Sequence, residues 1–200
     1  MKNPLDSLGQ TILLGVILAV ILALLVNALN INYAWWAFFF RWLHVLSGVM
    51  WIGLLWYFNF VQTPTMPKIP ADQRPVIVKN ILPVALFWFR WAALSTVVTG
   101  LILAWLNGYI ADALALGFID GVAKDRAIGV GMWLGLIMAY NVWFIIWPNQ
   151  QKALNIGNAF PDLPADQKAK AARTAGLTSR VNTMLSVPML FCMAAGPHLA

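Results

Sequence analysis

The sequence predicts an all-α integral membrane protein, with a single domain over residues 1–200 that forms a bundle of five transmembrane helices. Of the 200 residues, 61% are hydrophobic and 10% are charged. A soluble domain contains about 45–50% apolar residues. The mean hydropathy is +0.74, and the 11 tryptophans are typical of a protein whose aromatic side chains gather at membrane interfaces. The chain is therefore expected to lie in a lipid bilayer.

The first apolar run, at about residues 11–31, contains no charged residue and can cross about 30 Å of hydrocarbon as a helix. A cleavable signal peptide is the alternative. We expect the run to be retained, because it exceeds the usual apolar core of about 7–15 residues and no A-x-A cleavage site follows it. Four further apolar runs predict helices at about residues 35–60, 81–106, 128–147 and 182–199.

Three local patterns predict how these helices connect and pack. Residues 163–178 are rich in alanine and lysine, and they form either a short interfacial helix or, as we favour, a solvated linker. Gly131 and Gly135 make a GxxxG pattern in the fourth helix, which predicts close packing against a neighbouring helix. Asn141 in the same helix is expected to make an interhelical hydrogen bond rather than to contact a substrate.

Basic residues predict the orientation of the helices, because loops rich in lysine and arginine stay on the cytoplasmic side. The loop between the second and third helices carries Lys68, Arg74 and Lys79, and the loop before the fifth helix carries five more basic residues. The N-terminus is therefore predicted in the cytoplasm and the C-terminus outside, in a multi-pass protein of the bacterial inner membrane. This topology also accounts for the net charge of +6, so we expect no nucleic-acid partner.

Two arginines, Arg41 and Arg90, lie inside the apolar runs, whereas all seven acidic residues are aspartates outside them. An unpaired charge at the centre of a membrane helix costs about 2.5–3.5 kcal/mol. Each arginine is therefore expected to have a partner, which could be an anionic ligand, a lipid phosphate, an acid group of a cofactor or a backbone carbonyl. The lack of membrane carboxylates disfavours a proton-coupled carrier and a di-iron oxygenase.

Two histidines, His44 in the second helix and His198 near the C-terminus, are the candidate metal ligands. They are too few for a protein-only zinc site or a three-histidine copper site, and the single Cys192 excludes a CxxC site. Two histidines suffice for one haem b. Helix geometry places His44 about 13 Å and His198 about 6 Å below the outer surface, so a haem held by His44 alone makes fewer demands on the fold.

Spacing places Arg41, His44, Gly48 and Trp51 on one face of the second helix, because they recur at steps of three and four residues. A cation, a ligand, a gap and an aromatic wall together form a surface for a haem or another flat ligand. Gly48 would let a planar ring approach the backbone, and Arg41 could meet an acid group. The alternative is a histidine bonded to a carbonyl of a neighbouring helix and an arginine that extends outward.

Three stretches go beyond composition: RWLHVLSGVMWIG at residues 41–53, WPNQQK at residues 147–152, and SRVNTMLSVPMLF at residues 179–191 leading to His198. Together they resemble the membrane domain of the bacterial membrane-bound urate hydroxylase family. The resemblance implies that Arg41 and His44 belong to that family's strongest motif and that His198 is its terminal histidine. Full-length members carry a C-terminal cytochrome c, whereas this chain has no CxxCH and is expected to be a short form.

These observations lead to one expected function and two alternatives. We expect a redox-associated or haem b-binding subunit in the lipid bilayer, with partner membrane subunits or an external electron carrier. In this hypothesis His44, with or without His198, ligates iron, and Arg41 and Arg90 hold acid groups. The alternatives are a non-catalytic structural subunit of a larger respiratory or photosynthetic complex, and the oxidation of urate or a similar planar anion, so that enzymatic activity itself stays open.

Overall fold

The computed structural model of the chain describes residues 3–26, 30–118 and 123–195, and within these ranges it contains helices and no strand. Short 3-10 helices occur at Pro4–Asp6, Met66–Lys68 and Ile156–Asn158. Three π-helical segments are η2 (Tyr57–Gln62), η4 (Ile77–Ile81) and η5 (Asn141–Ile146). The α-helices are α1 (Leu8–Leu25), α2 (Tyr33–Trp56), α3 (Thr63–Thr65), α4 (Arg74–Val76), α5 (Leu82–Leu106), α6 (Ile110–Leu114), α7 (Ala123–Tyr140), α8 (Trp147–Leu154) and α9 (Ala165–Ala195).

Four helical stretches in the described residues are long and apolar enough to cross a membrane: Leu8–Leu25, Tyr33–Lys68, Arg74–Leu106 and Asp125–Leu154. They overlap the first four predicted helices and support a multi-pass membrane protein, but α1 ends at Leu25 and residues 30 and 31 are not helical, so the predicted end at residue 31 was wrong. The last three are longer than predicted, because the helices continue into residues that are too polar to count as membrane core. The predicted topology and the predicted bacterial inner membrane stay predictions.

Helix α9 differs most from the sequence-based prediction. Residues 165–178 belong to this continuous helix, so the favoured interpretation of residues 163–178 as a solvated linker was wrong. Alanine and lysine have high helix propensities, and Pro164 stands directly before the helix, a position where proline does not interrupt the hydrogen bonding. That the apolar second half of α9 is a fifth membrane span stays a prediction, as does the boundary at residue 199, which lies outside the described residues.

The chain divides into two compact units, residues 1–39 and residues 40–200, and the expected single domain stays a prediction. The first unit contains α1 and the first turns of α2. Within it the ring of Trp35 stacks on Phe39, with 5.3 Å between their centroids, and meets Trp36 edge-on. The second unit contains the rest of α2 and all later helices, and every site described below belongs to it.

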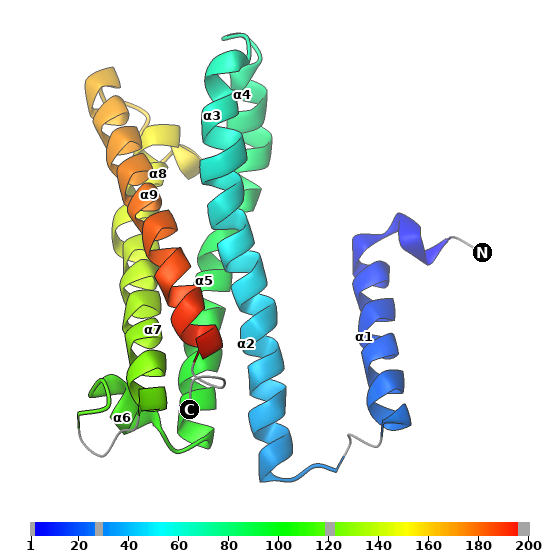
Figure 1. Ribbon diagram of the computed structural model, residues 1–200. Helices are drawn as coiled ribbons and strands as arrows, with labels where there is room; N and C mark the ends of the chain where they lie inside the picture. The colour runs from blue at the N-terminus through cyan, green and yellow to red at the C-terminus, as the bar shows by residue number, and fades with distance from the viewer. Residues whose placement is uncertain (1–2, 27–29, 119–122, 196–200) are drawn as a thin grey trace. The chain divides into compact units, whose positions relative to one another are not determined.

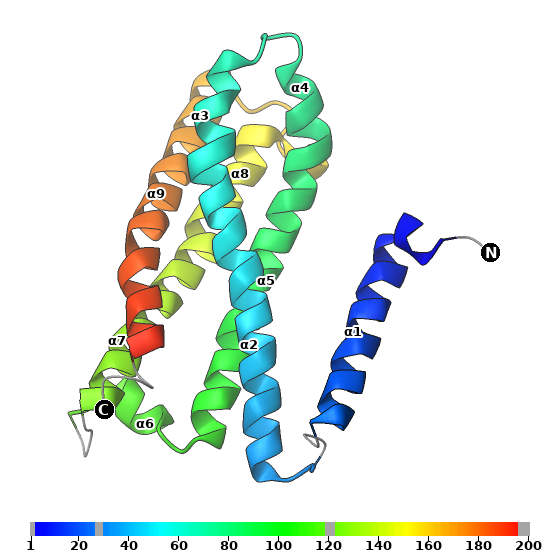
Figure 2. The same ribbon diagram turned by 45° about the vertical axis from the view of Figure 1, so that its right-hand side comes forward.

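The long helices of the second unit place the basic connections at one end. Figures 1 and 2 show α3, α4, α8 and the start of α9 at this end, and α6 with the start of α7 at the other. Both predicted cytoplasmic loops therefore meet at the same end of the unit, which we call the basic end. Its basic residues are Lys68, Arg74, Lys79, Lys152, Lys168, Lys170 and Arg173.

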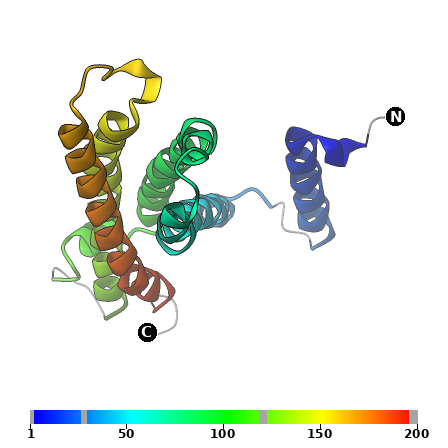
Figure 3. The same cartoon turned by 90° about the horizontal axis from the view of Figure 1, so that it is seen from above.

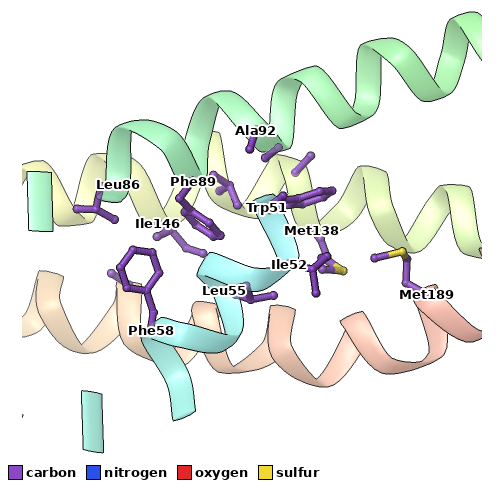
Figure 4. Close-up of a cluster of buried hydrophobic side chains, with 14 of the residues drawn as sticks. Trp51, Ile52, Leu55, Phe58, Leu86, Phe89, Ala92, Met138, Ile146 and Met189 are labelled. Carbon is purple, nitrogen blue, oxygen red and sulfur yellow. The ribbon is translucent and has the colours of Figure 1, made fainter. Parts of the chain in front are cut away.

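Side chains from α2, α5, α7 and α9 form the core of the second unit. Figure 3 shows α7 beside α9 and α5 beside α2 when the bundle is seen from above. Figure 4 shows Trp51 and Leu55 of α2 pointing between the other helices, where Trp51 is only 1% exposed. The cluster is completed by large apolar side chains from the other three helices and from η5, among them Leu86, Phe89, Met138, Ile146 and Met189.

Polar side chains attach α9 to this core through hydrogen bonds. Asn141 donates to Oδ1 of the fully buried Asn182 at 2.8 Å, and Asn182 donates to the Met138 carbonyl at 2.9 Å. The expected interhelical hydrogen bond of Asn141 is thus confirmed. The Trp56 indole donates to Ser186 at 2.9 Å. Since these groups bond to other helices, α9 can carry polar residues on its inner face without leaving them unpaired.

Candidate functional site

His44 lies between α2 and α5, where small residues of α5 leave room for its ring. Its Nδ1 is 2.8 Å from the backbone carbonyl oxygen of Thr96, and 3.5 Å from the hydroxyl of Thr99. A Cβ added to Gly100 would lie 2.8 Å from Cε1 of the imidazole, so no other residue fits at position 100 without moving the ring. The alternative interpretation of His44, a bond to a carbonyl of a neighbouring helix, describes this contact.

The Thr96 contact also fixes the chemistry of the imidazole. A carbonyl oxygen only accepts hydrogen bonds, so the proton of neutral His44 is on Nδ1, and Nε2 carries the lone pair. Within the described residues no hydrogen-bond partner of Nε2 is found. Metal-ligating histidines commonly use one ring nitrogen to bond a backbone carbonyl while the other binds the metal. The contact that orients the ring therefore leaves the lone pair of Nε2 available to bind a metal.

The other predicted members of the α2 face have different surroundings. Gly48 faces α5, because a Cβ at this position would lie 3.9 Å from the Thr96 methyl group. Trp51 is buried in the core shown in Figure 4, and its indole nitrogen has no hydrogen-bond partner among the described residues. The structure thus brings His44 and Gly48 to the same neighbour on α5, Thr96. Trp51 instead packs in the core cluster.

Arg90 of α5 has an aromatic partner. Its guanidinium carbon lies 3.7 Å from the centroid of the Trp147 ring and 5.2 Å from that of Trp143, and Trp143 in turn meets Trp91 edge-on. A cation over an aromatic face is stabilised by about 2 kcal/mol or more when it is desolvated. The sequence-based list of partners omitted aromatic faces. The spacing of Trp143 and Trp147, one helical turn apart, was the available signal.

Arg41 is exposed and lies in the first half of α2, and Figure 1 shows that this helix runs from the end opposite the basic end toward α3. It interacts electrostatically with Tyr109, in the connection after α5, and Asp125 at the start of α7 acts on the same phenol. Burial raises the pKa of Tyr109 above its ordinary value, the Arg41 charge lowers it, and the Asp125 charge raises it. The net direction is upward. Arg41 is therefore not adjacent to Arg90, and the two arginines belong to separate sites.

The pKa of Tyr109 gives a direct test of the position of Arg41. Removing the nearby positive charge in Arg41→Gln should raise the pKa of Tyr109 further, and Asp125→Asn should lower it. The tyrosinate absorbance of each protein, minus that of its Tyr109→Phe counterpart, measures the midpoint of the Tyr109 titration. An unchanged midpoint in Arg41→Gln would contradict the placement.

The raised pKa of Tyr109 also affects stability, because the folded pKa exceeds the unfolded value of about 10. The contribution of neutral Tyr109 to the free energy of unfolding is complete below that pH and is lost as the pH rises through the folded pKa.

The described residues do not complete a metal centre from protein ligands alone. Within residues 3–26, 30–118 and 123–195, no group of three or more His, Cys, Asp or Glu side chains could hold a metal ion. His198, the second predicted ligand, lies outside the described residues. Cys192 is a free cysteine whose Cβ is close to Gly131 of α7, in a packing role.

A comparison of the chain with protein families, with curated proteins and with solved structures gives no match. The resemblance to the urate hydroxylase membrane domain therefore rests on the three motifs alone. The structure assigns physical roles to all three. The first motif supplies His44 and the core residues Trp51 and Ile52, the second supplies the Trp147 ring under Arg90, and the third supplies the hydrogen-bonding residues Asn182 and Ser186.

Proposed function

We propose that this chain is a redox-associated subunit of a bacterial inner membrane that holds a b-type haem through Nε2 of His44. The observation that carries the proposal is the 2.8 Å contact between His44 Nδ1 and the Thr96 carbonyl. This contact orients the ring and leaves the lone pair of Nε2 free to bind iron. Partner membrane subunits or an external electron carrier would exchange the electron. The resemblance to the urate hydroxylase membrane domain, whose strongest motif here contains Arg41 and His44, supports the same assignment.

The number of protein ligands favours haem over another metal centre. The porphyrin itself supplies four nitrogen ligands to iron, so one histidine is enough to attach it, whereas a zinc or copper site needs three or more protein ligands. When bound, the haem would supply one-electron chemistry. His44 would hold the iron, and His198 stays the proposed second ligand.

Arg41 and Gly48 are the neighbours on α2 that suit this role. Arg41 precedes His44 by one turn on the same side of the helix and is exposed, so its guanidinium can meet a carboxylate of the haem. Gly48 follows His44 by one turn and adds no side chain that would block a planar ring. Arg90, whose guanidinium lies on Trp147, stays outside the proposed haem site.

Absorption spectra of the gently purified protein, oxidised and then reduced with dithionite, test the proposal without knowledge of a substrate. A b-type α-band that appears on reduction is the expected result. A featureless spectrum of a folded protein, expressed with an adequate supply of haem, would overturn it. Helical content measured by circular dichroism on the same sample separates absence of haem from absence of folded protein.

The second candidate is a non-catalytic structural subunit of a larger respiratory or photosynthetic complex. Large aromatic side chains on the outer surface of the second unit favour it, since Phe144 of η5 is 67% exposed and Phe191 of α9 is 66% exposed. Such faces suit another membrane chain as well as lipid. A colourless protein that copurifies with fixed amounts of other membrane chains would support this function in place of the first.

The third candidate, the oxidation of urate or a similar planar anion, comes from the resemblance alone. Purine-dependent oxygen uptake by membranes that contain the protein tests it. Uptake that requires His44 would join this candidate to the haem proposal, and no uptake with urate or related purines would remove it.

A further inference from the structure

A cavity of about 430 Å³ opens near the basic end of the second unit, away from His44. Binding pockets for small molecules have volumes of about 300–1,000 Å³. The cavity is bounded by η2 after α2, the beginning of α5, the junction of η5 and α8, and the middle of α9. Its polar lining residues are Asn59, Gln62, Thr63, Gln150, Arg173, Ser179 and Arg180.

The charge of this cavity is positive and uncompensated. Arg173 and Arg180 both line it and no acidic residue does. They are seven residues apart on α9, which places them two turns apart on one face of the helix, about 10 Å along its axis. Within the described part of the chain, neither guanidinium has a hydrogen-bond or ion-pair partner. A single anionic group between the two long side chains could contact both.

A second polar feature points to a ligand with hydroxyl groups. The Oε1 atom of Gln62 is buried and lacks a hydrogen-bond partner among the described residues. An unpaired buried acceptor costs about 1–3 kcal/mol, so a donor is expected at this position. By contrast, both N–H groups of the neighbouring Asn59 amide are already used, because Nδ2 donates to Ser179 at 2.8 Å and to the Leu55 carbonyl at 2.9 Å.

The floor of the cavity is apolar and aromatic. Phe58 of η2 and Phe89 of α5 meet edge-to-face, with 5.5 Å between their centroids, and Leu86 lies beside them, as Figure 4 shows. Two of the three π-helical segments contribute lining residues, Phe58 and Gln62 from η2 and Ile146 from η5. Single π-helical turns inside membrane-length helices are frequent at functional sites. The cavity thus combines a cationic rim with an apolar interior.

We propose that this cavity binds an acidic phospholipid. Its phosphate would lie between Arg173 and Arg180, and the first part of an acyl chain would rest on Phe58 and Phe89. A headgroup hydroxyl would donate to Gln62 Oε1 once that side chain turns toward the cavity. Basic pockets between membrane helices, on the side with the positive loops, suit such headgroups. A free phosphate ion shares the anionic chemistry, but it would leave the apolar floor uncovered. Phosphatidylglycerol carries both a phosphate and hydroxyl groups and is the matching probe.

Native mass spectrometry of the full chain, released from detergent, measures lipid binding with a charge-matched control. The test variant Arg173→Gln with Arg180→Gln removes two positive charges from the cavity. The control variant Lys168→Gln with Lys170→Gln removes two from the same helix, at residues that do not line the cavity. Phosphatidylglycerol, phosphatidylcholine and inorganic phosphate are added separately to each protein.

We expect one phosphatidylglycerol per chain on the wild type and on the lysine control, about tenfold less on the arginine variant, and little phosphatidylcholine on any of them. Equal losses in the two variants would show general attraction to the positive surface and would overturn the proposal. Inorganic phosphate that competes with phosphatidylglycerol at millimolar concentration, on the order of its cellular level, would assign the site to a free anion instead.

A pocket-filling variant tests the same site without removing charge. Gly176 lines the cavity, and a Cβ added to it would have no neighbouring atom within 4 Å. Leucine at this position should fill the cavity without displacing the core, so Gly176→Leu should lose phosphatidylglycerol while its thermal midpoint in detergent stays at or above that of the wild type. Gly53→Leu, which also enters open space but on the surface of α2, is the control and should retain the lipid. Unchanged lipid binding by Gly176→Leu would place the lipid elsewhere.

Discussion

Replacing Gly131 by leucine is expected to lower the free energy of unfolding of the bundle by about 1–3 kcal/mol. Gly131 of α7 is buried against α9, and an added Cβ would lie 2.9 Å from the Cβ of Cys192 and 3.5 Å from the Met189 carbonyl. The contact with Met189 is an ordinary van der Waals distance, and the third neighbour, Met193 Cε at 3.4 Å, can move aside. The Cβ of Cys192 is fixed to the backbone, so α9 itself must shift. The midpoint of unfolding in mixed micelles of mild detergent and dodecyl sulfate measures the loss.

Gly135→Leu is the matched control for this change. It makes the same substitution one turn further along the same helix, where an added Cβ meets no atom within 4 Å. Leucine has the higher helix propensity by about 0.8–1 kcal/mol, so this variant should be as stable as the wild type or more stable. Equal losses at the two positions would contradict the close contact of α7 with α9. The distances from the two added Cβ atoms already show that the close packing predicted from the GxxxG pattern is confirmed at Gly131 and was wrong at Gly135.

The sequence predicts helices where the membrane imposes a uniform apolar pattern. The runs at residues 35–60 and 81–106 lie within the long helical stretches Tyr33–Lys68 and Arg74–Leu106. The ends of these helices were predicted less well. Hydropathy indicates which residues lie in the apolar part of the bilayer, whereas the helical hydrogen bonds continue into polar residues beyond it. Residues 165–178 of α9 show this most clearly, since they continue the helix without any apolar run. Polar residues such as Asn182 also reduced the apparent hydropathy of α9, although the fold buries and pairs them.

The environment of the site residues was harder to predict, since it depends on which helices become neighbours. Spacing placed His44 and Trp51 on one face of a helix, but that face meets α5 at His44 and the centre of the core at Trp51. The sequence likewise showed a cation at Arg90 and no carboxylate within the apolar runs. Only the packing of α5 against η5 and α8 brings Trp143 and Trp147 to its guanidinium. The cavity between Arg173 and Phe58 joins residues more than a hundred positions apart, and no motif indicates it.

His44→Ala is expected to abolish the haem absorption band, and Gly100→Ala is expected to weaken or shift it. Gly100→Ala removes no side chain that could bind a metal. Its new methyl group would lie 2.8 Å from Cε1 and 3.0 Å from Nδ1 of the imidazole, so the ring must move away from α5 and lose its contact with the Thr96 carbonyl. Loss of such an orienting hydrogen bond commonly costs about 10–100-fold in metal affinity or activity. Gly53→Ala, where an added Cβ meets no atom, should leave the spectrum unchanged.

Added imidazole separates a ligand from a residue that only supports the fold. If Nε2 of His44 binds the iron, His44→Ala leaves a space of the size of the ring, and free imidazole should restore the reduced α-band. If His44 only joins α2 to α5 through the Thr96 carbonyl, its removal should lower the unfolding midpoint while the band persists, and imidazole should change neither. Because the first outcome depends on the donor atom and the second on the interhelical bond, measuring the band and the midpoint on the same sample decides between the two roles of one side chain.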